Sequence, residues 1–321
     1  MATLKDIKGT CVQSIAGDPS NPVEGQIWYN STARVLKGSR LTSTASWATT
    51  PALNTPRNNQ ATGGSGDATA GLSHGGWPAT YQADNEEFNG TTWSAANDLS
   101  TGSGSAAGFG TQTAAVHTMG GTPGRVTATE EYDGTNWTSG GNSTYSADVL
   151  AGTGILTAGF VAGGNSGSAY LTTAAEYDGT SWTAANSSPA TLNFHSGCGT
   201  QTATIMGASQ VTTPTQFFEY DGTNWTSTGA MGTGRELSSA NIGTQTAGLT
   251  AGGYIRPSTT NSTAVEQYDG SSWTSAPVLN TGLYGRCGSG TQTASLVSGG
   301  QTSTTSIAPT MMCLFQEYSG S

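Results

Sequence analysis

Charged side chains are scarce in this sequence, and positive ones are scarcer than negative ones. Asp, Glu, Lys and Arg make up 9% of the 321 residues, and the formal net charge is −10. All three lysines lie within the first 37 residues. Because binding to nucleic-acid phosphates needs clustered Lys and Arg, this composition argues against a nucleic-acid partner.

Long apolar runs and paired cysteines are also missing. No run is long enough to span a bilayer, and the first ten residues, MATLKDIKGT, lack the apolar core of a signal peptide. We therefore expect no membrane insertion and no signal peptide. The cysteines Cys11, Cys198, Cys287 and Cys313 show no CxxC spacing. We expect them to be reduced packing residues rather than disulfides or metal ligands.

What the sequence does contain is a repeat in which an aromatic residue, an Asp-Gly-like turn and a tryptophan follow one another. The copies are EFNGTTW (87–93), EYDGTNW (131–137), EYDGTSW (176–182), EYDGTNW (219–225), QYDGSSW (267–273) and a truncated EYSGS (317–321). Their aromatic positions are 44, 45, 43, 48 and 50 residues apart. A period of this size indicates an array of one supersecondary unit.

Each repeat is predicted to form four short strands. In the fifth repeat we expect strands at 235–242, 244–250 and 263–268, and a fourth from residue 272. Asp269-Gly270 is expected to form a two-residue hairpin turn with positive φ at both residues. The second strands are rich in Ala, Gly and Thr, and five of the six end in Gly-Gly. Since small residues suit a crowded axis, we predict a β-propeller in which the second strand is innermost.

The two ends of the chain predict how this propeller closes. The last repeat stops before any tryptophan, whereas an unpaired motif, STASW (43–47), precedes the first full repeat. We infer that the strand around Trp47 completes the last blade, which closes the ring and removes an exposed edge. The predicted architecture is an all-β, six-bladed propeller over residues 41–321. Residues 1–40 are predicted to form an N-terminal arm with a hairpin that pairs 27–29 with 35–36.

A strand ending in Gly-Gly, followed by a Tyr and then a Trp at this spacing, resembles the kelch repeat, whose copies form four-stranded propeller blades. The resemblance covers residues 41–321. GTQTA, a glycine pair and EYDGTxW are together similar to kelch-like repeats in virion proteins of tailed phages, especially marine cyanophages. Residues 18–38 are similar to a hairpin segment of phage tail-fibre proteins. The resemblance implies a structural or adhesive virion component, made in the host cytoplasm.

Three groups of polar residues are candidates for chemistry, and we assign structural roles to them. The residue before each repeat aromatic is Glu in five of the six copies, and we expect it to accept hydrogen bonds from the adjacent blade or turn. An acidic ring that binds a cation or a sugar is the alternative. His74, His117 and His195 fall at different offsets, which does not suggest a metal site. The seven arginines occupy scattered repeat positions, unlike the convergent arginines that a sialidase needs. We expect no cofactor and no enzymatic activity.

The loops between the second and third strands vary most between repeats, and binding on propellers usually depends on what differs between blades. These loops carry Trp77, Tyr81 and Tyr254, which we expect to be exposed, and the arginines Arg125 and Arg256. Aromatic faces beside amides and hydroxyls can stack on sugars and hydrogen-bond to them. We therefore predict these five residues as ligand-binding residues, with a plain solvent-exposed loop as the alternative reading of each.

The leading hypothesis is a non-enzymatic phage virion protein, associated with the tail, whose loops contact host-surface glycans. The alternative is a capsid or tail decoration protein that binds other virion proteins through its arm. A propeller glycosidase is the third hypothesis. For the arm itself, docking onto a neighbouring subunit and packing across its own propeller both stay open. A homo-oligomer within the virion is expected by analogy with fibres.

Overall fold

The computed structural model describes residues 13–16, 27–38, 46–63, 67–77, 80–209, 213–236, 241–256, 258, 260–302 and 315–319. The chain divides into two compact units, residues 1–44 with 321 and residues 45–320. Cys11 and Cys313, the segment 303–314 and the last turn, for which we made predictions, lie outside the described residues. All regular structure in the described part is β-strand.

The N-terminal unit contains a three-stranded sheet. Its strands are β1 (Gln13–Ile15), β2 (Ile27–Asn30) and β3 (Val35–Gly38). β2 and β3 pair antiparallel around the turn at 31–34, which confirms the predicted hairpin. β1 adds to the other edge of β2 in parallel orientation, a pairing that the sequence did not reveal.

The second unit contains five four-stranded sheets, called blades 1 to 5 here, whose strands follow one another in the chain. Blade 1 comprises β5 (Ala61–Gly63), β6 (Leu72–His74), β7 (Asn85–Phe88) and β8 (Trp93–Ala96). Blade 2 comprises β9 (Ala107–Thr111), β10 (Ala114–Thr118), β11 (Thr129–Tyr132) and β12 (Trp137–Ser139). Blade 3 comprises β13 (Ala151–Ile155), β14 (Ala158–Ala162), β15 (Ala174–Tyr177) and β16 (Trp182–Ala185).

Blades 4 and 5 follow the same plan. Blade 4 comprises β17 (Ser196–Thr200), β18 (Ala203–Ser209), β19 (Thr213–Tyr220) and β20 (Trp225–Ser227). Blade 5 comprises β21 (Asn241–Thr244), β22 (Ala247–Ala251), β25 (Val265–Tyr268) and β26 (Trp273–Ala276). Between β22 and β25 a small hairpin is inserted, made of β23 (Tyr254–Ile255) and β24 (Thr260–Asn261).

A further four-stranded sheet, called the composite sheet here, joins the two ends of the second unit. Its strands are β27 (Cys287–Gly290), β28 (Ala294–Ser298), β29 (Phe315–Ser319) and β4 (Ser46–Thr50). β29 pairs antiparallel with β4, and Tyr318 lies opposite Trp47. The Trp47 indole is buried and donates to the Pro277 carbonyl at 2.9 Å. β4 is thereby attached to the connection that leaves blade 5.

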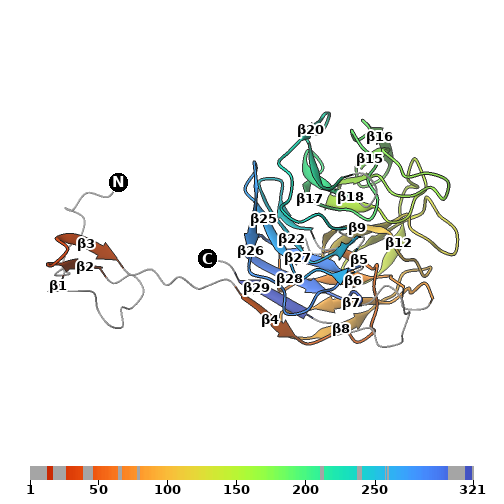
Figure 1. Cartoon of the computed structure of the whole chain (residues 1–321). Helices are drawn as coiled ribbons and strands as arrows, with labels where there is room; N and C mark the ends of the chain where they lie inside the picture. Colours follow the sequence, from red (N-terminus) through yellow and green to blue (C-terminus); the bar gives the residue numbers. More distant parts are fainter. Residues whose placement is uncertain are drawn as a thin grey trace. The chain divides into compact units, whose positions relative to one another are not determined.

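The strand nearest the axis is the first strand of each sheet, not the second as predicted. β5 lies beside β9, β9 beside β13, β13 beside β17, β17 beside β21, β21 beside β27, and β27 beside β5. Figure 1 shows the sheets of this unit around that centre. Glycine is needed here because neighbouring first strands nearly touch. A Cβ on Gly108 would lie 2.7 Å from the Thr62 backbone nitrogen. The arrangement is that of an all-β propeller.

The turn between the third and fourth strands also differs from its prediction. Tyr132 lies opposite Trp137, so that four residues, 133–136, form the turn instead of two. The Asp133 carboxylate accepts hydrogen bonds from the backbone N–H groups of Asn136 at 2.7 Å and Thr135 at 2.8 Å, and these bonds lower its pKa. Within the turn only Gly134 has a positive φ, of 89°. Aspartate serves as an acceptor for the turn's backbone, an Asx-type turn.

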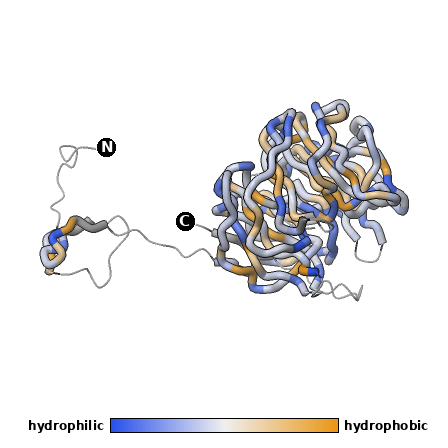
Figure 2. Tube along the Cα trace, turned by 45° about the horizontal axis from the view of Figure 1, so that its top comes forward, coloured by the Kyte–Doolittle hydropathy of each residue, from blue (hydrophilic) through white to orange (hydrophobic). Residues whose placement is uncertain are grey.

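Neighbouring blades are joined by hydrogen bonds between the repeated Tyr and Glu. This confirms the prediction that the glutamates accept hydrogen bonds from the adjacent blade. The Tyr132 hydroxyl donates to Glu87 of the preceding blade at 2.7 Å, and Tyr220 donates to Glu176 at 2.8 Å. Tyr177 with Glu131, and Tyr268 with Glu219, repeat the contact. Burial is the largest cause that raises the pKa of these tyrosines, followed by the carboxylate partner. The apolar residues lie along the sheets, with hydrophilic stretches at many loop tips (Figure 2).

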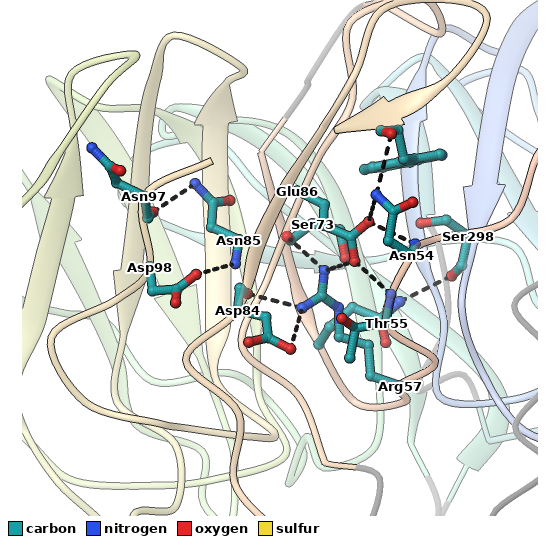
Figure 3. A network of polar contacts seen from close by, with 12 residues as sticks. Asn54, Thr55, Arg57, Ser73, Asp84, Asn85, Glu86, Asn97, Asp98 and Ser298 are labelled. Carbon is teal, nitrogen blue, oxygen red and sulfur yellow. Dashed lines mark hydrogen bonds and ion pairs between the residues drawn. The ribbon is translucent and has the colours of Figure 1, made fainter. Parts of the chain in front are cut away.

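Two arginines that we had regarded as scattered occupy matching places in blades 1 and 5. Arg57 lies 2.7 Å from Glu86, and Arg235 lies 2.7 Å from Glu266, with all four side chains buried. Figure 3 shows the Arg57 guanidinium between Glu86 and the carbonyls of Asp84 and Ser73. Each pair fixes the connection that enters its blade, because the glutamate also accepts backbone N–H groups from that connection.

Candidate functional site at the mouth of the propeller

The connections between blades and the loops after the second strands lie at the same face, called the mouth face here. At its centre, Asn59, Ser105, Val149, Phe194 and Gly285 each precede a first strand, and all have positive φ, between 45° and 69°. Their backbones are hydrogen-bonded in series. Ser105 N–H donates to the Asn59 carbonyl, and Val149 N–H to the Ser105 carbonyl, both at 2.8 Å. Asn59 N–H donates to Gly285 at 2.9 Å.

These five residues, called the ring at the mouth here, place a different side chain from each of blades 1 to 4 around the axis, and the composite sheet contributes Gly285. Val149 is β-branched and Phe194 is bulky, so both are strained at positive φ. Backbone strain of this kind is maintained by surrounding structure and occurs preferentially at functional sites. Below the ring lies a cavity of about 110 Å³, whose lining includes Gln60, His195 and Arg286. A second cavity of about 70 Å³ further along the first strands is lined largely by glycines.

Trp77 and Tyr81, two of the predicted ligand-binding residues, form an exposed aromatic pair. Their ring centroids are 6.0 Å apart at an interplanar angle of 23°. Trp77 is 40% exposed and Tyr81 is 37% exposed. The Trp77 N–H donates to the Asn58 carbonyl at 2.8 Å, one residue before the ring at the mouth. The Tyr81 hydroxyl lies over Gly121 of the next blade. The pair is therefore fixed by backbone contacts, not carried on a free loop tip.

Tyr254, the third predicted aromatic residue, is only 3% exposed, which contradicts our expectation. Two hydrogen bonds with Glu236, Tyr254 N to Glu236 O and Glu236 N to Tyr254 O, bind its backbone to the connection that enters blade 5. Its ring packs against Tyr284, with centroids 5.4 Å apart. Arg256 lies over the ring at 5.2 Å and pairs with Glu236. The arginine side chain is 56% exposed, so it is the part of this group that solvent reaches.

Amide side chains connect the two aromatic groups. The Asn58 amide nitrogen donates to the Gln301 side-chain oxygen, and the Gln301 amide donates to the Tyr284 hydroxyl. The Asn261 amide donates to the Gln301 backbone carbonyl at 2.9 Å. Trp77, Tyr81, Asn58, Gln301, Tyr284, Tyr254 and Arg256 form a contiguous aromatic and amide band along blade 1, the composite sheet and blade 5.

Arg125, the last predicted residue, belongs to a separate contact between blades 2 and 3. Its guanidinium lies 3.1 Å from the Asp148 carboxylate, and its Nε donates to the Asn165 carbonyl at 2.6 Å. Burial raises the pKa of Asp148, and Arg125 partly offsets that rise. The structure thus brings Trp77 together with Tyr81 and Tyr254 with Arg256, while Arg125 is used to hold two blades together.

The histidines come closer together than their sequence offsets indicated. The Nδ1 atoms of His74 and His117 are 3.0 Å apart at the buried contact between blades 1 and 2, beside the Trp137 ring. Burial is the main cause that lowers the pKa of both, to about 4 for His117. No group of three His, Cys, Asp or Glu side chains suited to a metal occurs among the described residues. Cys198 and Cys287 are free and buried.

Comparison with known proteins bears on the fold of this chain and not on its function. No family model and no curated protein matches the chain. Among solved structures, that of YjhT is similar, with a TM-score of 0.66 over 84% of this chain and 95% of that one. Identity with YjhT is 12%. The chain is a β-propeller. In the part of the chain that the structure describes, no helix is long and apolar enough to cross a membrane.

Sequence reasoning missed the residues that connect the site. Asn58, Tyr284, Gln301 and Glu236 lie in three connections and one loop end, far apart along the chain, and none belongs to the repeated motif. Position offered one signal. Asn58 and Glu236 each follow a buried arginine, and Gln301 follows the last glycine pair. In blade 3, blade 5 and the composite sheet, the residue after the glycine pair bridges to the connection that enters the same sheet. The bridges are Asn165 to Asp148, Tyr254 to Glu236 and Gln301 to Tyr284.

Proposed function

We propose that this protein is a non-enzymatic virion protein of a tailed phage, associated with the tail, that attaches to host-surface glycans through the mouth face of its propeller. The observation that carries the glycan part is the exposed, stacked Trp77–Tyr81 pair, which a backbone hydrogen bond joins to Asn58 of the amide network. A sugar offers an apolar C–H face and a rim of hydroxyls. A rigid aromatic surface beside amides complements both.

The lining of the cavity below the ring argues against the third hypothesis, a propeller glycosidase. Hydrolysis of a glycosidic bond uses a pair of carboxylic side chains, and the described lining of the cavity contains neither Asp nor Glu. Both buried Arg–Glu pairs are satisfied by backbone groups and enclosed in their blades. The virion assignment rests on the resemblance of the repeat and of residues 18–38 to phage proteins.

We further propose that the five blades and the composite sheet together make a six-bladed, kelch-like ring closed by β4. Two features support closure at the same place. β4 completes the sheet begun by β27 and β28. On the mouth face, Asn59 of the connection into blade 1 donates its N–H to Gly285 of the connection into the composite sheet.

Decoration of the capsid or tail is the second candidate, with the N-terminal arm binding other virion proteins. It is favoured by the division of the chain into two compact units, since the β1–β3 sheet belongs to the N-terminal unit and not to the unit of the propeller. A sheet of three short strands buries little apolar surface by itself, which suits a segment that docks onto a neighbour. In this reading the arm determines where the protein sits.

Immunogold electron microscopy of intact virions, with antibody raised against the propeller, tests the proposal. We expect label at the tail or fibre tips. Label spread over the head would replace attachment with decoration, and the arm would then be the segment to mutate. Particles that carry no label, while the antibody recognises the purified protein, would contradict a virion role altogether.

A further inference from the structure

Arg286 is a buried cation that has no carboxylate partner among the residues that the structure describes. It is 5% exposed, and its Nη2 donates to two neutral acceptors, the carbonyls of Ala251 at 2.9 Å and Leu283 at 2.8 Å. Its Nε has no hydrogen-bond partner among the described residues. Arg57 and Arg235, which are equally buried, each have a glutamate at 2.7 Å. Burying an unpaired charge is costly, so buried arginines are normally paired.

The cavity that Arg286 lines holds other unsatisfied polar atoms. The Gln60 side-chain oxygen and the Ser196 hydroxyl are buried and have no partner in the described part of the chain, and both residues line the cavity. Native structures leave few such atoms unpaired, and those that remain require an explanation such as water or a bound ion. The cavity of about 110 Å³ is large enough for several atoms of a ligand.

Position within the repeat shows that the fold does not require an arginine at this place. The residue that follows the ring at the mouth is Gln60, Ala106, Leu150 and His195 in blades 1 to 4, and Arg286 in the composite sheet. Arg286 therefore occupies a place where an apolar residue suffices in two blades. The Arg286 side chain fits because two neighbouring residues are glycines. A Cβ on Gly252 would overlap Nη2 of the guanidinium, and a Cβ on Gly300 would clash with the Cγ of Arg286. A feature present in one blade alone is what a specific site needs.

We propose that the axial cavity binds a small oxyanion, a carboxylate or a phosphate-type group, with Arg286 supplying the positive charge and Ser196 a hydroxyl donor. The anion would balance the buried charge, which no described carboxylate of the lining balances. Charge-assisted hydrogen bonds to arginine are the strongest that a protein offers to such a group. Burial and the neighbouring Arg235 lower the pKa of Arg286 to about 9, so the guanidinium stays charged at neutral pH. This site is independent of glycan binding by the aromatic band.

Thermal unfolding of the full chain in the presence of anions tests this proposal. Sodium acetate and sodium phosphate are each titrated against sodium chloride at constant ionic strength. We expect a saturable rise in Tm with at least one of the two oxyanions, since a ligand that binds only the folded state stabilises it. Saturation by acetate would identify a carboxylate site, and saturation by phosphate a tetrahedral-anion site. Chloride should give no saturable rise.

Arg286→Gln is the decisive variant, because Gln60 shows that glutamine fits this position in another blade. We expect its apparent Kd for the anion to rise about tenfold or more, since a charged hydrogen bond is lost. Arg34→Gln, which removes the same charge from an exposed position in the N-terminal unit, should respond like the wild type. Where Arg286→Gln fails to fold, Ser196→Ala takes its place and should also weaken binding.

Three results would overturn the site. The first is a wild-type protein whose Tm shows no saturable response to either oxyanion. The second is an Arg286→Gln variant that folds and keeps the wild-type response. The third, where that variant does not fold, is a Ser196→Ala variant with an unchanged response.

Discussion

Acid should destabilise this propeller through its buried histidines, and His195 gives the cleanest measurement. His195 is 4% exposed, and its burial lowers the pKa from 6.5 to about 3, although a hydrogen bond with the Ala162 backbone acts in the opposite direction. Leu150 occupies the same place in the preceding blade. His195→Leu therefore removes the titrating group and retains a side chain that the fold already accommodates.

Whether acid raises or lowers the stability depends on which state, folded or unfolded, binds the proton at the higher pH. The unfolded chain protonates His195 near pH 6.5, whereas the folded chain does so only near pH 3. Stability is therefore complete above pH 6.5 and is lost as the pH falls from there towards 3. Each pH unit in that window costs about 1.4 kcal/mol per histidine. Between pH 6.5 and pH 5, His195 alone should cost about 2 kcal/mol. His117, with a pKa of about 4, adds a similar loss over that interval.

Urea unfolding followed by tryptophan fluorescence at several pH values measures these losses. The wild-type free energy of unfolding should fall steeply below pH 6.5. In His195→Leu the fall between pH 6.5 and pH 5 should be smaller by about 2 kcal/mol. Equal pH slopes for the two proteins would refute the reasoning, because they would mean that His195 titrates alike in the folded and unfolded states.

Three further predictions concern the framework. Tyr220→Phe should lower the free energy of unfolding by about 1–2 kcal/mol in urea, since it removes one interblade hydrogen bond to a carboxylate. Phe88 at the equivalent place shows that the ring alone fits, and an unchanged stability would contradict the role of the hydroxyl. Glu266→Gln should cost about 3 kcal/mol in the same assay, because it leaves a buried guanidinium unpaired; a loss below that of Tyr220→Phe would count against it. Removal of residues 1–44 should leave the Tm of the propeller nearly unchanged, whereas removal of residues 1–50 should lower it strongly, because β4 is then lost. Equal Tm values for the two truncations would argue against ring closure by β4.

The repeat predicted the second, third and fourth strands of blade 5 from local patterns, but not its first strand, which is Asn241–Thr244 and not 235–242. The register across the turn was not predicted. Tyr268 lies opposite Trp273, as Tyr132 lies opposite Trp137, whereas a two-residue turn would place Tyr268 opposite Ser271. The tryptophan motif missing from the last repeat predicted that the strand around Trp47 would complete the last sheet, although its partner strand is more than 260 residues away in the chain. A strongly periodic sequence makes such a distant pairing recognisable, since a repeat that lacks its last strand can be matched with an isolated copy of that strand elsewhere in the chain.

The choice of innermost strand failed for a physical reason. The first and second strands are both rich in small residues, and composition alone does not separate them. What decides is the contact between neighbouring blades, where the first strands approach so closely that a Cβ on Gly108 would meet backbone. That contact is a tertiary one. Its only sign in the sequence is glycine at alternate positions of the first strand, such as Gly108 and Gly110.

The candidate site was predicted in part. Trp77 and Tyr81 come from one loop, and their exposure could be expected from the loop's polarity and length. The burial of Tyr254 could not, because it depends on Tyr284, a residue 30 positions away in a different connection. Arg286 is only one of seven arginines in the sequence. That its Nη2 donates to two backbone carbonyls, and that no carboxylate in the described part of the chain pairs with it, is visible only in three dimensions.

Binding of the purified protein to an array of bacterial surface glycans tests the central claim most directly. The account predicts that the wild type binds a defined set of glycans and that Trp77→Ala with Tyr81→Ala abolishes this binding at unchanged Tm. Ile155→Ala, which removes an exposed apolar side chain from the β13–β14 turn at the opposite end of a first strand, should bind like the wild type. Glycan binding that survives the loss of both aromatic rings, or a wild type that binds no glycan, would contradict the account.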